Sequence, residues 1–124
     1  MYRTLRRATA PVLIASLLVV SLAWAFHATL VKAVPAIECR VAAPPTDLTL
    51  WFNERPDLAL SNIRLIGPDS VPVLVGAPRA ASDSMALTAS IRGVLTPGKY
   101  TVRFRTAGPD GHVMQGKYSF TYQP

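Results

Sequence analysis

Apolar and polar residues alternate along several short stretches of this chain, with the period of two that half-buried β-strands show. The two clearest stretches are 99–105 and 116–122, whose apolar positions are Tyr100, Val102, Phe104, Tyr118, Phe120 and Tyr122. The residues between these positions are mainly Thr, Ser, Arg and Lys. Each stretch is therefore predicted to place one side against a core and the other side in solvent.

The same pattern predicts seven short strands, separated by turns rich in Pro and Gly. Their expected ranges are 29–34, 48–52, 62–66, 71–75, 85–91, 99–105 and 116–122. Pro72 interrupts the fourth, which is therefore predicted to be an edge strand. Residues 76–84 are expected to form a loop. Because no helical period extends over ten or more residues of this region, the pattern indicates an all-β fold, a small immunoglobulin-like β-sandwich.

The first 25 residues have a different pattern. Arg3, Arg6 and Arg7 precede an almost wholly apolar run from residue 10 to residue 22, which ends in Ala23-Trp24-Ala25. This order of basic, apolar and small-residue regions is typical of a secretory signal peptide, so residues 1–25 are predicted to be removed on export. The alternative is an uncleaved helix that anchors the chain to the inner membrane, although the apolar run is short for a span. Residues 26–124 form the expected domain.

Removal of the leader changes the charge of the working protein. The leader contains three of the 13 Lys and Arg residues and none of the seven Asp and Glu, so ten minus seven leaves a net charge of about +3. The basic residues occur singly along the chain, and no cluster typical of nucleic-acid binding is visible, so no nucleic-acid partner is expected. Cys39 is the only cysteine, which excludes an internal disulfide, and its alternation with Ile37 and Val41 favours a buried position.

Few residues could carry chemistry. No Ser lies in a nucleophile motif, no carboxylate spacing indicates a glycosidase, and there is no Gly-rich phosphate loop and no C-x-x-C, so we predict that the protein is not an enzyme. Asp110 and His112 are two residues apart in the loop between the two clearest strands and should project to the same side. A carboxylate oxygen and an imidazole are donors that suit Cu(II). Taken alone, however, Asp110-Gly111 also fits an ordinary hairpin turn.

The only other histidine, His27, strengthens the metal interpretation because it directly follows the predicted leader. Cleavage after Ala25 would make His27 the second residue, with amine, amide and imidazole as chelating donors. Cleavage one residue later would make it the first residue, with amine and imidazole as donors. In either case the terminal amine must lose its proton, so binding should weaken in acid. The alternative is that His27 is merely an exposed residue near a terminus.

A series of segments resembles the family of periplasmic copper-resistance protein C (CopC), in order and over nearly the whole expected domain. The segments are His27-Ala-Thr-Leu30, Val34-Pro-Ala36, Val41-Ala-Ala-Pro44, Leu48 to Glu54, Leu95 to Tyr100, Asp110-Gly-His112 and Gly116. The resemblance implies a seven-stranded Greek-key β-sandwich. It also implies one Cu(II) ion bound by His27, through amine and imidazole, together with Asp110 and His112. Phe26 departs from the family pattern, in which the histidine usually follows the cleavage site directly. Glu54, Thr106 and Gln115 are candidates to orient His112.

The resemblance implies a monomeric periplasmic protein that holds copper and delivers it to an inner-membrane copper importer or another copper protein, with no small organic substrate. Some family members hold Cu(I) in a Met-rich loop, but Met85 and Met114 are the only methionines after the leader, so no Cu(I) site is expected. Met114 is expected to pack in the core. Two alternatives remain open: a copper-dependent oxidative enzyme with a paired-histidine site, and an exported β-sandwich that binds a protein partner without metal.

Overall fold

A computed structural model describes residues 30–124. The predicted signal peptide, the candidate anchor, Phe26 and His27 lie outside these residues. Strands and two short 3-10 helices account for all the regular structure in the described part. In order, the elements are β1 (Leu30–Val34), β2 (Arg40–Val41), β3 (Asp47–Phe52), η2 (Leu58–Leu60), β4 (Asn62–Ile66), η3 (Pro68–Ser70), β5 (Pro72–Val73), β6 (Arg79–Ala80), β7 (Ala86–Ser90), β8 (Gly98–Ala107) and β9 (Val113–Tyr122). Within residues 30–124 no helix has the length and apolar character needed to cross a membrane.

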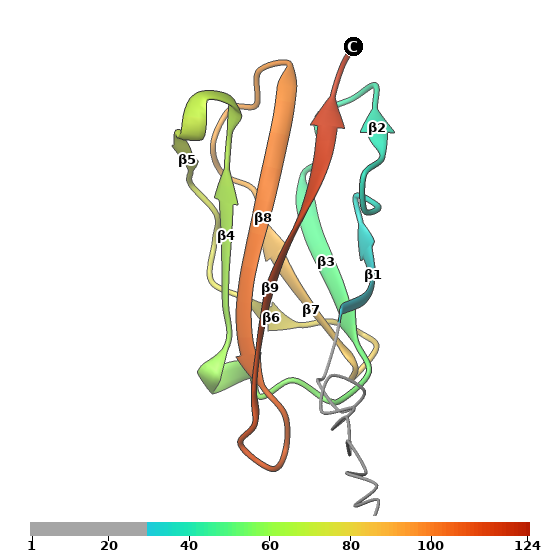
Figure 1. Ribbon diagram of the computed structural model, residues 1–124, viewed down its shortest axis with the longest axis vertical. Helices are drawn as coiled ribbons and strands as arrows, with labels where there is room; N and C mark the ends of the chain where they lie inside the picture. Colours follow the sequence, from blue (N-terminus) through green and yellow to red (C-terminus); the bar gives the residue numbers. More distant parts are fainter. Residues whose placement is uncertain (1–29) are drawn as a thin grey trace, which may run out of the picture.

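The strands form two sheets that face each other as a β-sandwich (Figure 1). One sheet has the order β1-β3-β7-β6, and the other has the order β2-β9-β8-β4-β5. The chain crosses repeatedly from one sheet to the other, so that strands close in sequence often lie in different layers. The predicted all-β sandwich is confirmed, and β5, which contains Pro72, is an edge strand as expected.

All seven predicted strands are present in the structure, and two further strands were not predicted. β2 pairs in parallel with the end of β9. β6 pairs with β7 and lies inside the segment 76–84, which was expected to be a loop. Each has only two residues, which is too short for an alternating pattern to be visible. Such strands are defined by hydrogen bonds to a neighbour and not by their own sequence.

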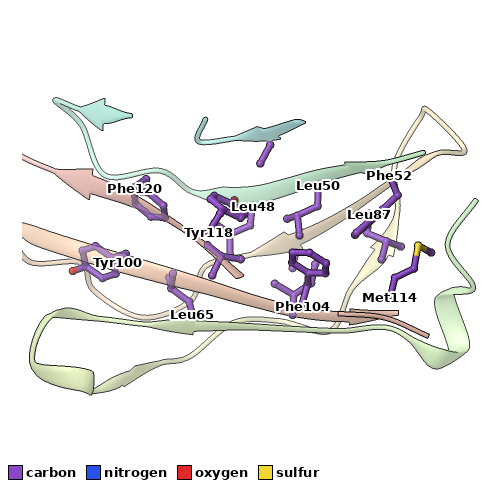
Figure 2. Close-up of a cluster of buried hydrophobic side chains, with 14 residues drawn as sticks. Leu48, Leu50, Phe52, Leu65, Leu87, Tyr100, Phe104, Met114, Tyr118 and Phe120 are labelled. Carbon is purple, nitrogen blue, oxygen red and sulfur yellow. The ribbon is translucent and has the colours of Figure 1, made fainter. Parts of the chain in front are cut away.

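The core lies between the two sheets and consists of the inward residues that the alternation identified (Figure 2). Leu48 and Leu50 of β3 are fully buried, as is Val102 of β8. Phe52 of β3 and Phe104 of β8 meet edge to face across the core, with ring centroids 5.4 Å apart. Because aromatic pairs in this geometry add to the free energy gained by burial, this contact stabilises the packing of the two sheets.

Two sulfur-containing residues differ in how fully they are buried. Met114 is buried in the core, as predicted (Figure 2), whereas His112 is exposed. Cys39 is only half-buried and packs against the margin of the core, so its predicted burial is partial.

Candidate metal centre

The two longest strands, β8 and β9, form one hairpin whose loop is Gly108 to His112. The loop is closed by two backbone hydrogen bonds of 3.0 Å, from Gly108 N to the His112 carbonyl and from Gly111 N to the Gly108 carbonyl. Gly111 has φ +82°, which favours glycine, and Pro109 suits the second position of such a turn. The local sequence thus folds into a tight turn that holds Asp110 and His112 beyond the ends of the strands.

The turn places the side chains of Asp110 and His112 against each other, as the spacing predicted. The His112 backbone N donates to Asp110 Oδ1 over 3.1 Å, and a second hydrogen bond joins His112 Nδ1 to Asp110 Oδ2. Both side chains are open to solvent, with 84% of the His112 side chain exposed. A carboxylate and an imidazole therefore converge on one accessible point at the tip of the hairpin.

Each member of this pair changes the pKa of the other. The hydrogen bonds from the His112 ring and backbone hold the pKa of the Asp110 carboxyl below its usual range. The hydrogen bond to Asp110, followed by the negative charges of Asp110 and Glu54, raises the pKa of the His112 imidazole above its usual 6.5. The carboxylates of Asp110 and Glu54 thus favour a positive charge at this site, whether it is a proton on His112 or another cation.

Glu54, from the loop after β3, lies beside this hairpin. A methyl group added at Gly108 would collide with Glu54 Oε2 and would lie 3.3 Å from Asp110 Oδ1. The glycine therefore leaves room for a second carboxylate next to the pair. Of the three residues expected to orient His112, Glu54 is the one that the structure brings to the loop.

The other two candidates have different environments. Thr106 is buried, and its hydroxyl is hydrogen-bonded to Ser61 Oγ at 2.6 Å. Gln115 is exposed on β9, opposite Arg105 of β8. The sequence could not rank the three because Glu54 is distant along the chain and reaches the loop only through the packing of the two sheets.

The start of the described chain lies at this same end of the sandwich (Figure 1). Leu30, the first residue of β1, is paired with Phe52, the last residue of β3, and Glu54 follows two residues later. Leu30 comes three residues after His27, and three residues can span at most about 10 Å. His27 itself lies outside the described residues, and among residues 30–124 no group of three His, Cys, Asp or Glu could hold a metal ion.

Replacing Asp110 with Asn should lower the pKa of His112 towards 6.5. The substitution removes the charge and the strongest acceptor that favour the protonated ring, while the turn keeps its backbone hydrogen bonds. The measurement is an NMR titration of the His112 imidazole in metal-free protein. Glu54→Gln is the matched control and should lower the pKa less, since Glu54 acts only through its charge. An unchanged His112 pKa in Asp110→Asn would contradict the pairing.

Comparisons with known proteins agree with this fold. The model of the CopC domain family matches residues 30–123. The structure of CopC from Methylosinus trichosporium OB3b is 32% identical, with a TM-score of 0.71, and the match covers 79% of this chain and 95% of that one. PcoC, a methionine-rich copper resistance protein from Escherichia coli, is 29% identical with a TM-score of 0.70, and covers 78% of this chain and 99% of its own.

A more distant similarity concerns the fold alone. The surface layer protein SbsC has a TM-score of 0.61 at 16% identity, over 82% of this chain and 14% of that one. No curated protein sequence matches the chain.

Proposed function

Because the chain belongs to the CopC domain family, we propose that it is an exported copper carrier that holds one Cu(II) ion with His27, Asp110 and His112. The observation that carries the proposal is the exposed Asp110–His112 pair at the end of the sandwich where β1 begins. The two solved structures compared above at 32% and 29% identity are named as CopC and as a copper resistance protein. The mature protein would work in the periplasm and pass its copper to an importer or another copper protein.

The donor set suits oxidised copper. Imidazole nitrogen, carboxylate oxygen and a terminal amine are ligands of Cu(II), whereas Cu(I) prefers several thioethers or thiolates. PcoC is described as methionine-rich, but this chain has only Met85 and Met114 after residue 25, and Met114 is buried in the core. In the metal-free pair, the hydrogen bond to the ionised Asp110 carboxylate would require a proton on His112 Nδ1. Copper would displace that proton, so acid should favour release of the ion.

Glu54 would support the site without being a required ligand. Its carboxylate lies next to Gly108 and Asp110, where it adds negative charge close to the pair. Groups in this position commonly hold a liganding histidine in one orientation. The three proposed ligands and Glu54 would together place two carboxylates near one divalent cation.

The proposal is tested by characterising the exported protein as the cell makes it. Mass spectrometry of the mature N-terminus should show a first residue of Phe26 or His27, with a free amine. Titration with Cu(II) should then saturate at one equivalent, with the absorption and paramagnetic resonance spectra of a tetragonal nitrogen and oxygen site. A mature chain that begins beyond His27, or a protein that does not bind Cu(II), would overturn the proposal.

A mature protein whose terminal amine is acetylated is the matched control for the amine. It keeps every side chain but can no longer offer the amine as a donor. We expect weaker Cu(II) binding and a changed spectrum, since the chelate ring that includes the amine is lost. A separate assay distinguishes a copper carrier from a copper enzyme. It measures ascorbate oxidation and peroxide release by the copper-loaded protein. The copper-loaded carrier should be no faster than the same concentration of free Cu(II).

A further inference from the structure

The outer face of the five-stranded sheet has an unusual charge distribution. Its three central strands, β4, β8 and β9, contain no Asp or Glu. They contain five basic residues, all exposed: Arg64, Lys99, Arg103, Arg105 and Lys117. These residues are scattered along the sequence, where they form no visible cluster. The pairing of the strands brings them together on one face, which we call the basic face.

The strand register places like charges directly opposite each other. Arg64 of β4 pairs with Arg103 of β8, and Arg103 pairs on its other side with Lys117 of β9. The three residues thus lie in a row across β4, β8 and β9, which are neighbouring strands of one sheet (Figure 1). Like charges in directly opposed positions destabilise a sheet, so folding stability does not explain this arrangement.

The basic residues of this row have no counterion within residues 30–124, where the ion pairs are Arg79–Asp47 and His112–Asp110. Residues 1–29 cannot supply one by their side chains, because they contain no Asp or Glu. The other sheet differs: Arg79 is paired with Asp47, and Lys32 lies over the Trp51 ring at 4.5 Å. Both cations of the four-stranded sheet therefore have a partner, whereas the row on the five-stranded sheet has none among the described residues.

Four of the five basic residues also line a hollow of about 680 Å³ on this face. Its polar lining consists of Asn62, Arg64, Arg103, Arg105, Gln115 and Lys117. All six side chains can donate hydrogen bonds, and four of them are positively charged. Such a lining suits carboxylates, because the guanidinium fork matches a carboxylate with two parallel hydrogen bonds.

We infer that the basic face is a docking surface for an extended, carboxylate-rich segment of a protein partner. Arg103 and Arg105 are two residues apart on β8 and point the same way, so they are separated by about 6.8 Å. An extended acidic segment with a carboxylate at every second residue has the same spacing. The outward positions of the three strands carry no exposed aromatic side chain, whereas membrane-surface and single-stranded nucleic-acid sites typically use such side chains.

The basic face lies close to the proposed copper site. Arg105 is three residues before Gly108, which directly follows the end of β8, a distance of about 10 Å. A partner docked here would lie beside the Asp110–His112 hairpin. That this partner is the one that receives copper rests on the proposed function, whereas the docking itself does not depend on copper.

The test uses the mature protein with a chelator present, so that it is independent of copper binding. The probe is a short peptide of alternating Glu and Thr, and its matched control alternates Gln and Thr. NMR amide shifts should change on β4, β8 and β9 with the acidic peptide only. Binding at an ionic strength of about 0.01 M should weaken strongly at about 0.15 M, since salt screens exposed charges. No binding at low salt, or shifts located elsewhere, would overturn the inference.

Two double variants with the same net charge test whether peptide binding depends on the basic face or only on net charge. The double variant Arg103→Gln, Lys117→Gln should bind the acidic peptide roughly tenfold more weakly, because two surface ion pairs are lost. The control Lys32→Gln, Arg92→Gln removes the same charge outside the three strands and should bind like the parent. An equal loss in both variants would overturn the inference. So would tighter binding of the parent protein to phosphatidylglycerol vesicles than to the peptide, which would assign the face to a membrane.

The melting temperature provides the accompanying structural readout. Arg103→Gln relieves repulsion on both sides of the residue, so the double variant should melt at or above the temperature of the parent. Stability that is retained while peptide binding falls indicates a surface that serves recognition. A marked drop in melting temperature would show that the cations are structural and would contradict the inference.

Discussion

Cu(II) affinity should fall by at least about 100-fold when His112 is replaced by Ala. Loss of a residue that orients a ligand costs about 10- to 100-fold in affinity, and loss of the ligand itself should cost more. His112 is one of only two histidines in the chain, and its ring is the proposed nitrogen donor of the hairpin. No second imidazole is present among residues 30–124, Met114 is buried, and the Thr106 hydroxyl is bonded to Ser61. Competition titration of the mature protein against a chelator of known Cu(II) affinity measures the change.

The loss of Cu(II) affinity should come from removal of the imidazole ring and not from a disturbed hairpin. Val113, the next residue, is exposed and begins β9. Val113→Ala is therefore the matched control, and we expect it to bind Cu(II) like the parent. The His112 side chain is itself mainly exposed, so its removal should leave the melting temperature nearly unchanged. Equal Cu(II) affinity in His112→Ala and the parent would rule out the proposed site.

The second large effect concerns the core. Replacing Leu50 with Ala should lower the free energy of unfolding by about 3–5 kcal/mol, the range expected for a buried leucine whose cavity cannot fully collapse. Leu50 has no exposed surface and lies in the central part of β3, paired with Ala33 of β1 and Leu87 of β7. Small domains have a total stability of about 5–15 kcal/mol. The substitution should therefore remove a large share of the stability of this fold.

Urea unfolding followed by circular dichroism measures this loss. Leu60→Ala is the matched control because it removes the same atoms from a side chain that is 58% exposed on η2. Its effect should stay within about 0.5 kcal/mol. A loss for Leu50→Ala no greater than that for Leu60→Ala would mean that the sandwich core does not lie where the structure places it.

Much of the fold could be predicted from residues that are close in sequence. Burial of Tyr100, Val102 and Phe104 follows from their alternation with polar residues, and the edge position of β5 follows from Pro72. The contact between Asp110 and His112 was also predictable, since both belong to one turn. The two-residue strands β2 and β6 were missed because no periodicity exists over such lengths.

The remainder of the candidate site depends on contacts between distant parts of the chain. Glu54 was one of three candidates to orient His112, and only the structure shows that it lies against Gly108. The role of His27 stays a prediction that rests on the family resemblance and on the position of Leu30 beside Phe52. Its test is the mature N-terminus, because the free amine depends on where the leader is cut.

By itself the sequence determined that this chain forms a β-sandwich, and it predicted export and one candidate metal-binding hairpin. Alternation, turns and the leader are local properties, and they are visible without any knowledge of strand pairing. The tertiary structure decided which strands are neighbours and in which register. That register aligned Arg64, Arg103 and Lys117 in one row and set Glu54 beside the hairpin. Charges that are isolated in sequence became a surface because pairing between strands is a nonlocal property of the folded chain.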